Sequence, residues 1–99
     1  MRLSSLQIDV IQHAVSELAG KDATVRLFGS RTDDNARGGD IDLLVEIPHS
    51  VENPAWLSAR ISGRISYLLD GQKVDVLLLA PNLERFPIHD IAEKEGVML

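Results

Sequence analysis

The feature of this sequence that most restricts its fold is a largely apolar run at residues 41–47. It contains three consecutive apolar residues, Leu43-Leu44-Val45. Successive side chains of a strand point to opposite faces of a sheet, so a strand that is apolar at consecutive positions is buried on both faces. Pro48 ends the run. The sequence therefore predicts a central strand in a sheet whose two faces are both covered.

Segments with helical and strand-like patterns alternate along the rest of the chain. Apolar residues spaced three and four apart indicate helices, and short apolar stretches bounded by Gly or Pro indicate strands. We predict helices at 5–19, 54–70 and 88–95, a short helical turn after Gly29, and strands at 24–28, 41–47 and 73–79. This alternation predicts an α/β or α+β fold.

Length and composition narrow the classes of function. The 99 residues contain no repeat and no linker, so we expect one domain over 1–99. The absence of cysteine excludes disulfide scaffolds and zinc–thiolate sites. A net charge of −5 argues against binding to a nucleic-acid backbone. Because no apolar run is long enough to span a membrane and the N-terminus lacks a signal-peptide core, we expect a cytoplasmic protein.

Three aspartates occupy positions that a purely structural role does not explain. Asp40 and Asp42 stand two residues apart at the start of the central strand, so their side chains share a face. Asp75 interrupts the apolar strand 73–79 and reaches the same place if the two strands are neighbours. Like charges gathered in this way require protonation or a cation, and carboxylate oxygens suit Mg²⁺ or Mn²⁺. The simpler alternative is that Asp75 is an edge residue facing water.

A second motif, Gly29-Ser30, lies between a strand and a short helical turn. Glycine lets the backbone approach a ligand closely, and the N–H groups of a following helical turn can point at a phosphate. The alternative is an ordinary strand-to-helix cap, for which Ser30 and Asp33 have the spacing of a capping box. Together with the aspartates, this motif predicts a nucleotide site.

These residues carry a family resemblance. Leu27-Phe28-Gly29-Ser30-Arg31, followed by Gly39-Asp40-Ile41-Asp42 and then Asp75, resembles the signature of the minimal nucleotidyltransferases of the DNA polymerase β superfamily. The resemblance covers about residues 5 to 79 and implies a three-stranded mixed sheet flanked by helices. The chain departs from the pattern in having nine residues between Ser30 and Asp40, where many members have ten. It also has Gly39 where a serine commonly stands.

The resemblance also implies roles for individual residues. Gly29 and Ser30 would bind the β- and γ-phosphates of a nucleoside triphosphate, with Arg31 close to the triphosphate. Asp40, Asp42 and Asp75 would be the catalytic carboxylates and would ligate Mg²⁺ or Mn²⁺. The implied reaction is attack of a hydroxyl group on the α-phosphorus with release of pyrophosphate, and ATP is the substrate that the resemblance favours.

Small members of this family are often the antitoxin of a toxin–antitoxin pair, so the resemblance implies a helical HEPN-type partner and AMP transfer to a tyrosine of that partner. Three functions remain open. The chain is a nucleotidyltransferase acting on a partner protein, a non-catalytic module that neutralises a partner by binding, or an enzyme acting on a small molecule such as an aminoglycoside. The sequence leaves a homo-oligomer open as well.

Overall fold

The sheet is built around the strand that the apolar run predicts. A computed structural model describes residues 2–32 and 39–99, with Ser30 described by its backbone alone. Strand β2 (Ile41–Glu46) pairs antiparallel with β1 (Thr24–Phe28) and parallel with β3 (Val74–Leu79). The predicted central strand and the predicted neighbourhood of β2 and β3 are therefore confirmed.

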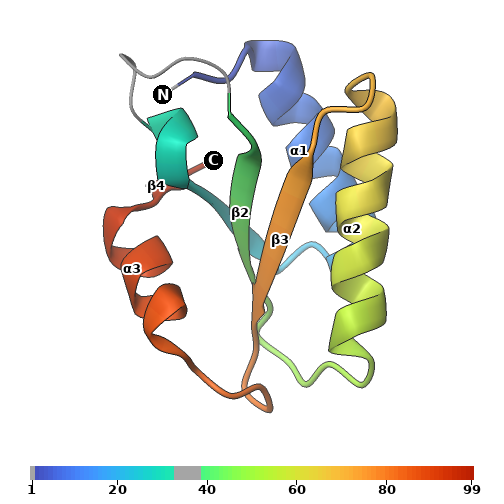
Figure 1. Ribbon diagram of the computed structural model, residues 1–99. Helices are drawn as coiled ribbons and strands as arrows, with labels where there is room; N and C mark the ends of the chain where they lie inside the picture. The colour runs from blue at the N-terminus through green and yellow to red at the C-terminus, as the bar shows by residue number, and fades with distance from the viewer. Residues whose placement is uncertain (1, 33–38) are drawn as a thin grey trace.

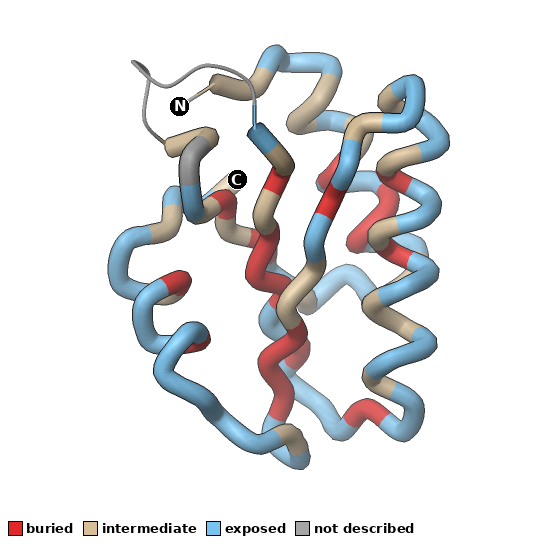
Figure 2. Tube along the Cα trace, viewed as in Figure 1, coloured by how far each residue is buried: buried red, intermediate tan, exposed pale blue. Residues whose placement is uncertain are grey.

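Helices cover both faces of this sheet, as the two-sided burial of β2 requires (Figures 1 and 2). Helices α1 (Ser5–Ala19) and α2 (Pro54–Leu68) pack on one face, where Leu43 belongs to the main core. Helix α3 (Pro87–Glu95) lies on the other face, where Leu44 packs with Leu79 and Ala92. The fold is the predicted mixed α/β fold.

The number of strands differs from the prediction. The sheet has four strands in the order β3-β2-β1-β4, where three were expected. Strand β4 (Val97–Met98) pairs antiparallel with β1 at Arg26 and Leu27. Two residues are too few to show an alternation of apolar and polar side chains, so the sequence pattern gives no signal for this strand.

Element boundaries follow local chemistry. Helix α1 has the predicted bounds, and its first turn is capped by Ser4, whose Oγ accepts from the Gln7 amide at 3.1 Å. Helix α2 ends at Leu68, two residues before the predicted end, because Asp70 has a φ of +58°. The predicted helical turn is the 3₁₀ helix η1 (Gly29–Thr32). The predicted capping partner of Ser30 lies outside the described residues.

Among the helices of residues 2–32 and 39–99, none is long and apolar enough to cross a lipid bilayer.

Candidate active site

Three strand ends meet at one edge of the sheet. Strands β2 and β3 are parallel and both begin there, while β1 is antiparallel to β2 and ends there. The end of β1 continues directly into η1, so Gly29 follows Phe28 at the point where Phe28 pairs with Asp42. In Figure 1 this edge lies at the top of the sheet, beside η1 and away from α3. The topology therefore brings the two predicted motifs to one place.

Asp42 and Asp75 are direct neighbours across the parallel pairing of β2 and β3. Asp42 is partly buried and Asp75 is exposed. The pKa of the Asp42 carboxyl is raised above its usual range, first by burial and then by the negative charges of Asp75 and Asp40. A side-chain hydrogen bond with Asp75 raises it further, which means that the protonated form of Asp42 donates to Asp75.

Asp40 lies just before β2 and is partly exposed. Its Oδ2 is 3.6 Å from the Nζ of Lys73, an exposed side chain at the start of β3. Lys73 also lowers the pKa of Asp42, opposing the effect of the carboxylates. The structure thus pairs Asp42 with Asp75, places Lys73 beside Asp40, and leaves Asp40 close enough for its charge to act on Asp42. The lysine stands two residues before Asp75, the spacing that places side chains on one face of a strand, and this pattern could have pointed to it.

Gly29 leaves room for the carboxylate of Asp42 beside it. A Cβ built on Gly29 would lie 2.5 Å from Asp42 Oδ2 and 3.3 Å from its Cγ. The φ of Gly29 is +76°, which residues with a Cβ rarely adopt. Both observations explain a glycine at this position, because only glycine lets the start of η1 lie directly against the carboxylate. A ligand that contacts the Gly29 backbone is therefore also close to Asp42.

The remaining two residues of the predicted phosphate site are in η1. The backbone of Ser30 belongs to η1, whereas its side chain falls outside the described part of the structure. The guanidinium of Arg31 is half-buried and donates to three neutral acceptors, the carbonyl of Arg2, the carbonyl of Gly39 and the side chain of Gln72. The phosphate contacts of Ser30 and Arg31 remain predictions.

The residues present fit the predicted metal by their chemistry. Residues 2–32 and 39–99 contain no ready-made group of three or more His, Cys, Asp or Glu side chains that could hold a metal ion. The charges of Asp40 and Asp75 nevertheless act on Asp42. Carboxylate oxygens are the ligands that Mg²⁺ and Mn²⁺ prefer, and a cation would remove the repulsion between these groups. The assignment of metal ligands stays a prediction.

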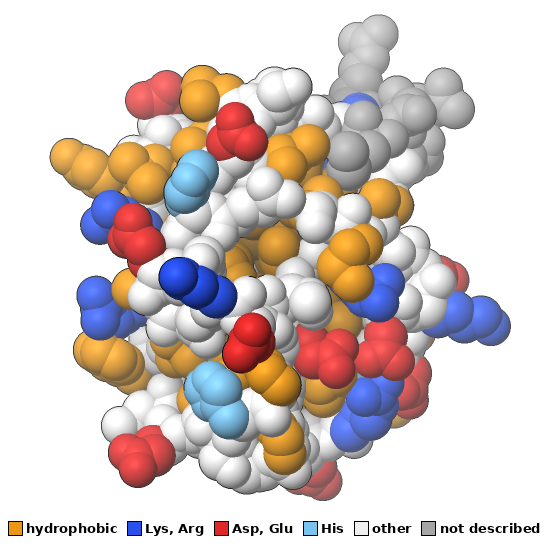
Figure 3. Space-filling view, turned by 180° about the vertical axis from the view of Figure 1, so that it is seen from behind, with side chains coloured by type: hydrophobic (Ala, Val, Ile, Leu, Met, Phe, Trp, Pro, Cys, Tyr) orange, Lys and Arg blue, Asp and Glu red, His pale blue; other side chains and the backbone are white. Residues whose placement is uncertain are grey.

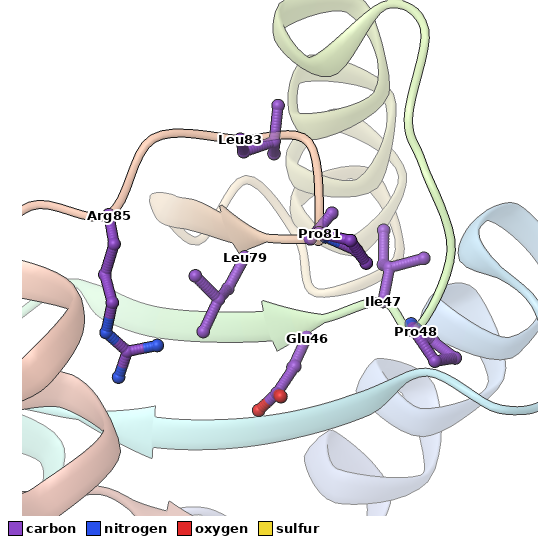
Figure 4. A pocket seen from close by; sticks show the side chains of 8 residues that line it. Glu46, Ile47, Pro48, Leu79, Pro81, Leu83 and Arg85 are labelled. Atoms are coloured by element: carbon purple, nitrogen blue, oxygen red, sulfur yellow. The ribbon is translucent and has the colours of Figure 1, made fainter.

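The hollow shown in Figure 4 lies at the opposite end of the sheet, where β2 and β3 finish. It has a volume of about 310 Å³ and is lined by Glu46, Ile47, Pro48, Leu79, Ala80, Pro81, Leu83 and Arg85. Glu46 stands four positions after Asp42 in β2, which is roughly 13 Å along an extended chain. This hollow is therefore distinct from the aspartate edge.

A family model described as nucleotidyltransferase domain matches residues 8–98 of this chain. The matched range includes every predicted site residue and the whole sheet. A comparison with curated proteins found no match.

Proposed function

Since the chain belongs to the nucleotidyltransferase domain family, we propose that it transfers AMP from ATP to a hydroxyl group of a partner protein, with Mg²⁺ or Mn²⁺ as the cofactor. Nucleotidyl transfer follows from the family, while the nucleotide, the metal and the acceptor are the proposal. We further propose that the chain is a minimal nucleotidyltransferase of the antitoxin type and that its partner is a HEPN-type toxin.

The observation that carries this proposal is the contact between Gly29 and Asp42. A triphosphate that lies on the backbone of η1 would bring its phosphorus atoms close to the carboxylates, because a Cβ on Gly29 would lie only 2.5 Å from Asp42 Oδ2 and Asp42 is paired with Asp75. Asp40, Asp42 and Asp75 would hold the metal ions, and these ions supply neutralisation of the charge on the phosphates and on the aspartates. Positioning and charge neutralisation are the main requirements of phosphoryl-type transfer.

In the proposed reaction, the oxygen of the acceptor hydroxyl attacks the α-phosphorus of ATP. A new oxygen–phosphorus bond forms, the bond from the α-phosphorus to the bridging oxygen breaks, and pyrophosphate leaves with that electron pair. The hydroxyl proton passes to Asp75, the exposed carboxylate of the pair, which an incoming group can reach. The products are the AMP-modified acceptor and pyrophosphate.

An acceptor on another protein is supported by the exposure of this edge. Asp75 is exposed, Asp40 is partly exposed, and the hollow of Figure 4 lies elsewhere. A hydroxyl on the surface of a second protein can approach such an edge. A small acceptor would instead benefit from an enclosed pocket that surrounds most of its surface.

The test is incubation of the chain with Mg²⁺, the protein encoded by the adjacent gene and ATP labelled on either the α- or the γ-phosphate. We expect covalent label on the partner from α-labelled ATP only. Asp42→Asn should abolish the label, whereas Asp9→Asn, on the exposed face of α1, should leave it unchanged. Parallel reactions with GTP, CTP and UTP measure the preference for the nucleotide.

Two outcomes would contradict the proposal. If the partner is neutralised equally well by the Asp40→Asn/Asp42→Asn variant, without label, the chain is a binding module. If label appears from γ-labelled ATP, the reaction is transfer of a phosphoryl group rather than of a nucleotidyl group.

A further inference from the structure

A network of hydrogen bonds surrounds the guanidinium of Arg31. Its Nη1 donates to the Arg2 carbonyl at 3.0 Å, its Nη2 donates to the Gln72 side-chain oxygen at 3.0 Å, and its Nε donates to the Gly39 carbonyl at 3.3 Å. The amide of Arg2 in turn donates to the Arg31 carbonyl at 2.8 Å. A planar guanidinium holds its donors in a fixed geometry, so these bonds fix the relative positions of four chain segments, those of Arg2, Arg31, Gly39 and Gln72.

Gln72 is the second member of this network. It is partly buried and lies in the turn before β3. Because Arg31 can only donate, the side-chain oxygen of Gln72 must face it, and the amide nitrogen then faces two carbonyls. This nitrogen donates to the Lys73 carbonyl at 3.2 Å and to the Gly39 carbonyl at 3.4 Å. The carbonyl of Gly39 therefore accepts from both side chains.

Gly39 stands directly before Asp40. Its φ is +95°, a conformation that favours glycine and directs its carbonyl toward Arg31 and Gln72. Strand pairing begins only at Ile41, whose amide donates to the Lys73 carbonyl at 3.0 Å. The β-ladder therefore does not fix Gly39 and Asp40. The network binds the carbonyl of Gly39, and Asp40 has in addition the ion pair with Lys73.

Three of the four segments joined by this network carry the proposed site. Arg31 belongs to η1 with Gly29, Gly39 precedes Asp40, and Gln72 stands three residues before Asp75. We propose that Arg31 and Gln72 are positioning residues, which hold the segment from Gly39 to Asp42 in place relative to η1 and so set the geometry of the aspartates. This inference rests on the proposed nucleotidyl transfer.

The role predicts a specific kinetic effect. Misplacing a reacting group by about 1 Å can lower a rate by roughly 100-fold. Loss of the network should therefore lower kcat and raise the Mg²⁺ concentration needed for half-maximal activity. The KM for ATP should change little, because the backbone of η1 remains. A purely structural role would lower the Tm and leave the kcat of the folded molecules unchanged.

The main variant is Gln72→Met, which keeps the length of the side chain and removes its hydrogen bonds. In the label-transfer assay we expect kcat to fall by about 10- to 100-fold, with the KM for ATP within about 3-fold of wild type. Gln12→Met, on the exposed face of α1, is the matched control and should behave as wild type. If Gln72→Met does not fold, Gln72→Glu replaces it in the same assay, because this side chain still accepts from Arg31 but has lost the amide donor.

Arg31→Lys separates positioning from contact with phosphate. A lysine keeps the charge but cannot donate to three acceptors in the geometry of a guanidinium. The same fall in kcat as in Gln72→Met supports positioning. A higher KM for ATP with unchanged kcat overturns this role for Arg31 and assigns the side chain to the triphosphate.

Amide hydrogen exchange distinguishes a failure of this inference from a failure of the proposed function. Exchange of the amides from Asp40 to Asp42 should be faster in Gln72→Met, while α1 and α2 exchange as in wild type. Unchanged local exchange together with unchanged kcat overturns the inference and leaves nucleotidyl transfer standing. If exchange is faster in Gln72→Met but the wild-type protein transfers no label, the positioning role of Gln72 is supported and the proposed reaction is contradicted.

Discussion

At the scale of the residue, the position of one carboxylate links the two motifs of the site. Asp42 is the cross-strand neighbour of both Phe28 and Asp75, and its Oδ2 lies 2.5 Å from the position that a Cβ of Gly29 would take. The spacing of Asp40 and Asp42 predicts that they share a face of a strand, but the structure places Asp40 directly before the first residue of β2, Ile41. The contact with Gly29 depends on the pairing of β1 with β2, which no local pattern specifies.

Gly29→Ala tests this contact. The new Cβ would lie 2.5 Å from Asp42 Oδ2, so the carboxylate must move, and the φ of +76° adds strain. We expect the transfer rate to fall by about 100-fold. Gly20→Ala is the matched control, because Gly20 also has a positive φ, +100°, while its nearest neighbour to a Cβ is 4.0 Å away.

The two glycine variants are compared by initial rates of label transfer and by thermal melting. Both should lose stability by about 1–3 kcal/mol because of the backbone strain. Only Gly29→Ala should lose activity. An equal loss of activity in the two variants would show that strain, and not the contact with Asp42, accounts for the glycine.

At the scale of the element, the helices and the three longer strands were predictable because each carries a periodic apolar pattern. The bounds of α1 and β1 agree with the prediction, whereas α2 was predicted two residues too long. The network of Arg31, Gly39 and Gln72 could not be predicted. It joins residues up to 41 positions apart through side-chain bonds, and such bonds leave no periodic signal in the sequence.

The attachment of α3 to the sheet depends on His89, a residue for which the sequence suggested no role. Its side chain is buried, with 4% exposed. Its Nδ1 accepts from the Phe86 amide at 3.0 Å, so the proton is on Nε2, which lies 2.9 Å from the Leu78 carbonyl and donates to it. The ring thus caps the start of α3 and joins it to β3.

His89→Leu should destabilise the fold by about 1–3 kcal/mol, because it leaves a buried carbonyl and a helix-terminal amide without partners. His13→Leu is the control, since His13 is exposed on α1 and should change the stability by about 0.5 kcal/mol or less. Urea denaturation measures both variants. Equal stabilities would show that apolar packing alone attaches α3.

At the scale of the whole molecule, the excess of acidic residues argues against a nucleic-acid acceptor. The net charge is −5, and the face seen in Figure 3 shows Lys and Arg side chains scattered among acidic and apolar ones, without a continuous basic stripe. Binding to a nucleic-acid backbone requires clustered basic residues. The sequence established the excess of acidic residues, but only the topology shows that three of them gather at one edge of the sheet.

This gathering of charge should lower the stability of the metal-free fold. The raised pKa of Asp42 means that the folded state disfavours its ionised form. The carboxyl therefore ionises at a lower pH in the unfolded state, and the free energy of unfolding falls as the pH rises from 3.8, the ordinary pKa of an aspartate, through the higher pKa of the folded state. The loss of stability due to Asp42 is complete above the pKa of the folded state and absent below pH 3.8. Asp42→Asn removes this loss of stability, and the side-chain amide of the asparagine can still donate to Asp75.

We therefore expect Asp42→Asn to raise the Tm of the metal-free protein at pH 7 by a few degrees, since about 1 kcal/mol moves the Tm of a domain of this size by roughly 4–8 °C and solvent screening reduces the repulsion. The difference should shrink as the pH falls toward 4. Added Mg²⁺ should raise the Tm of the wild type but not of the variant, because a cation that binds only the folded state stabilises it. Asp9→Asn should respond to Mg²⁺ as wild type does.

Two outcomes would contradict this account. If metal-free Asp42→Asn melts below the wild type at pH 7, the Asp42 carboxylate stabilises the fold. If Mg²⁺ raises the Tm of Asp42→Asn as much as that of the wild type, the cation binds away from Asp42.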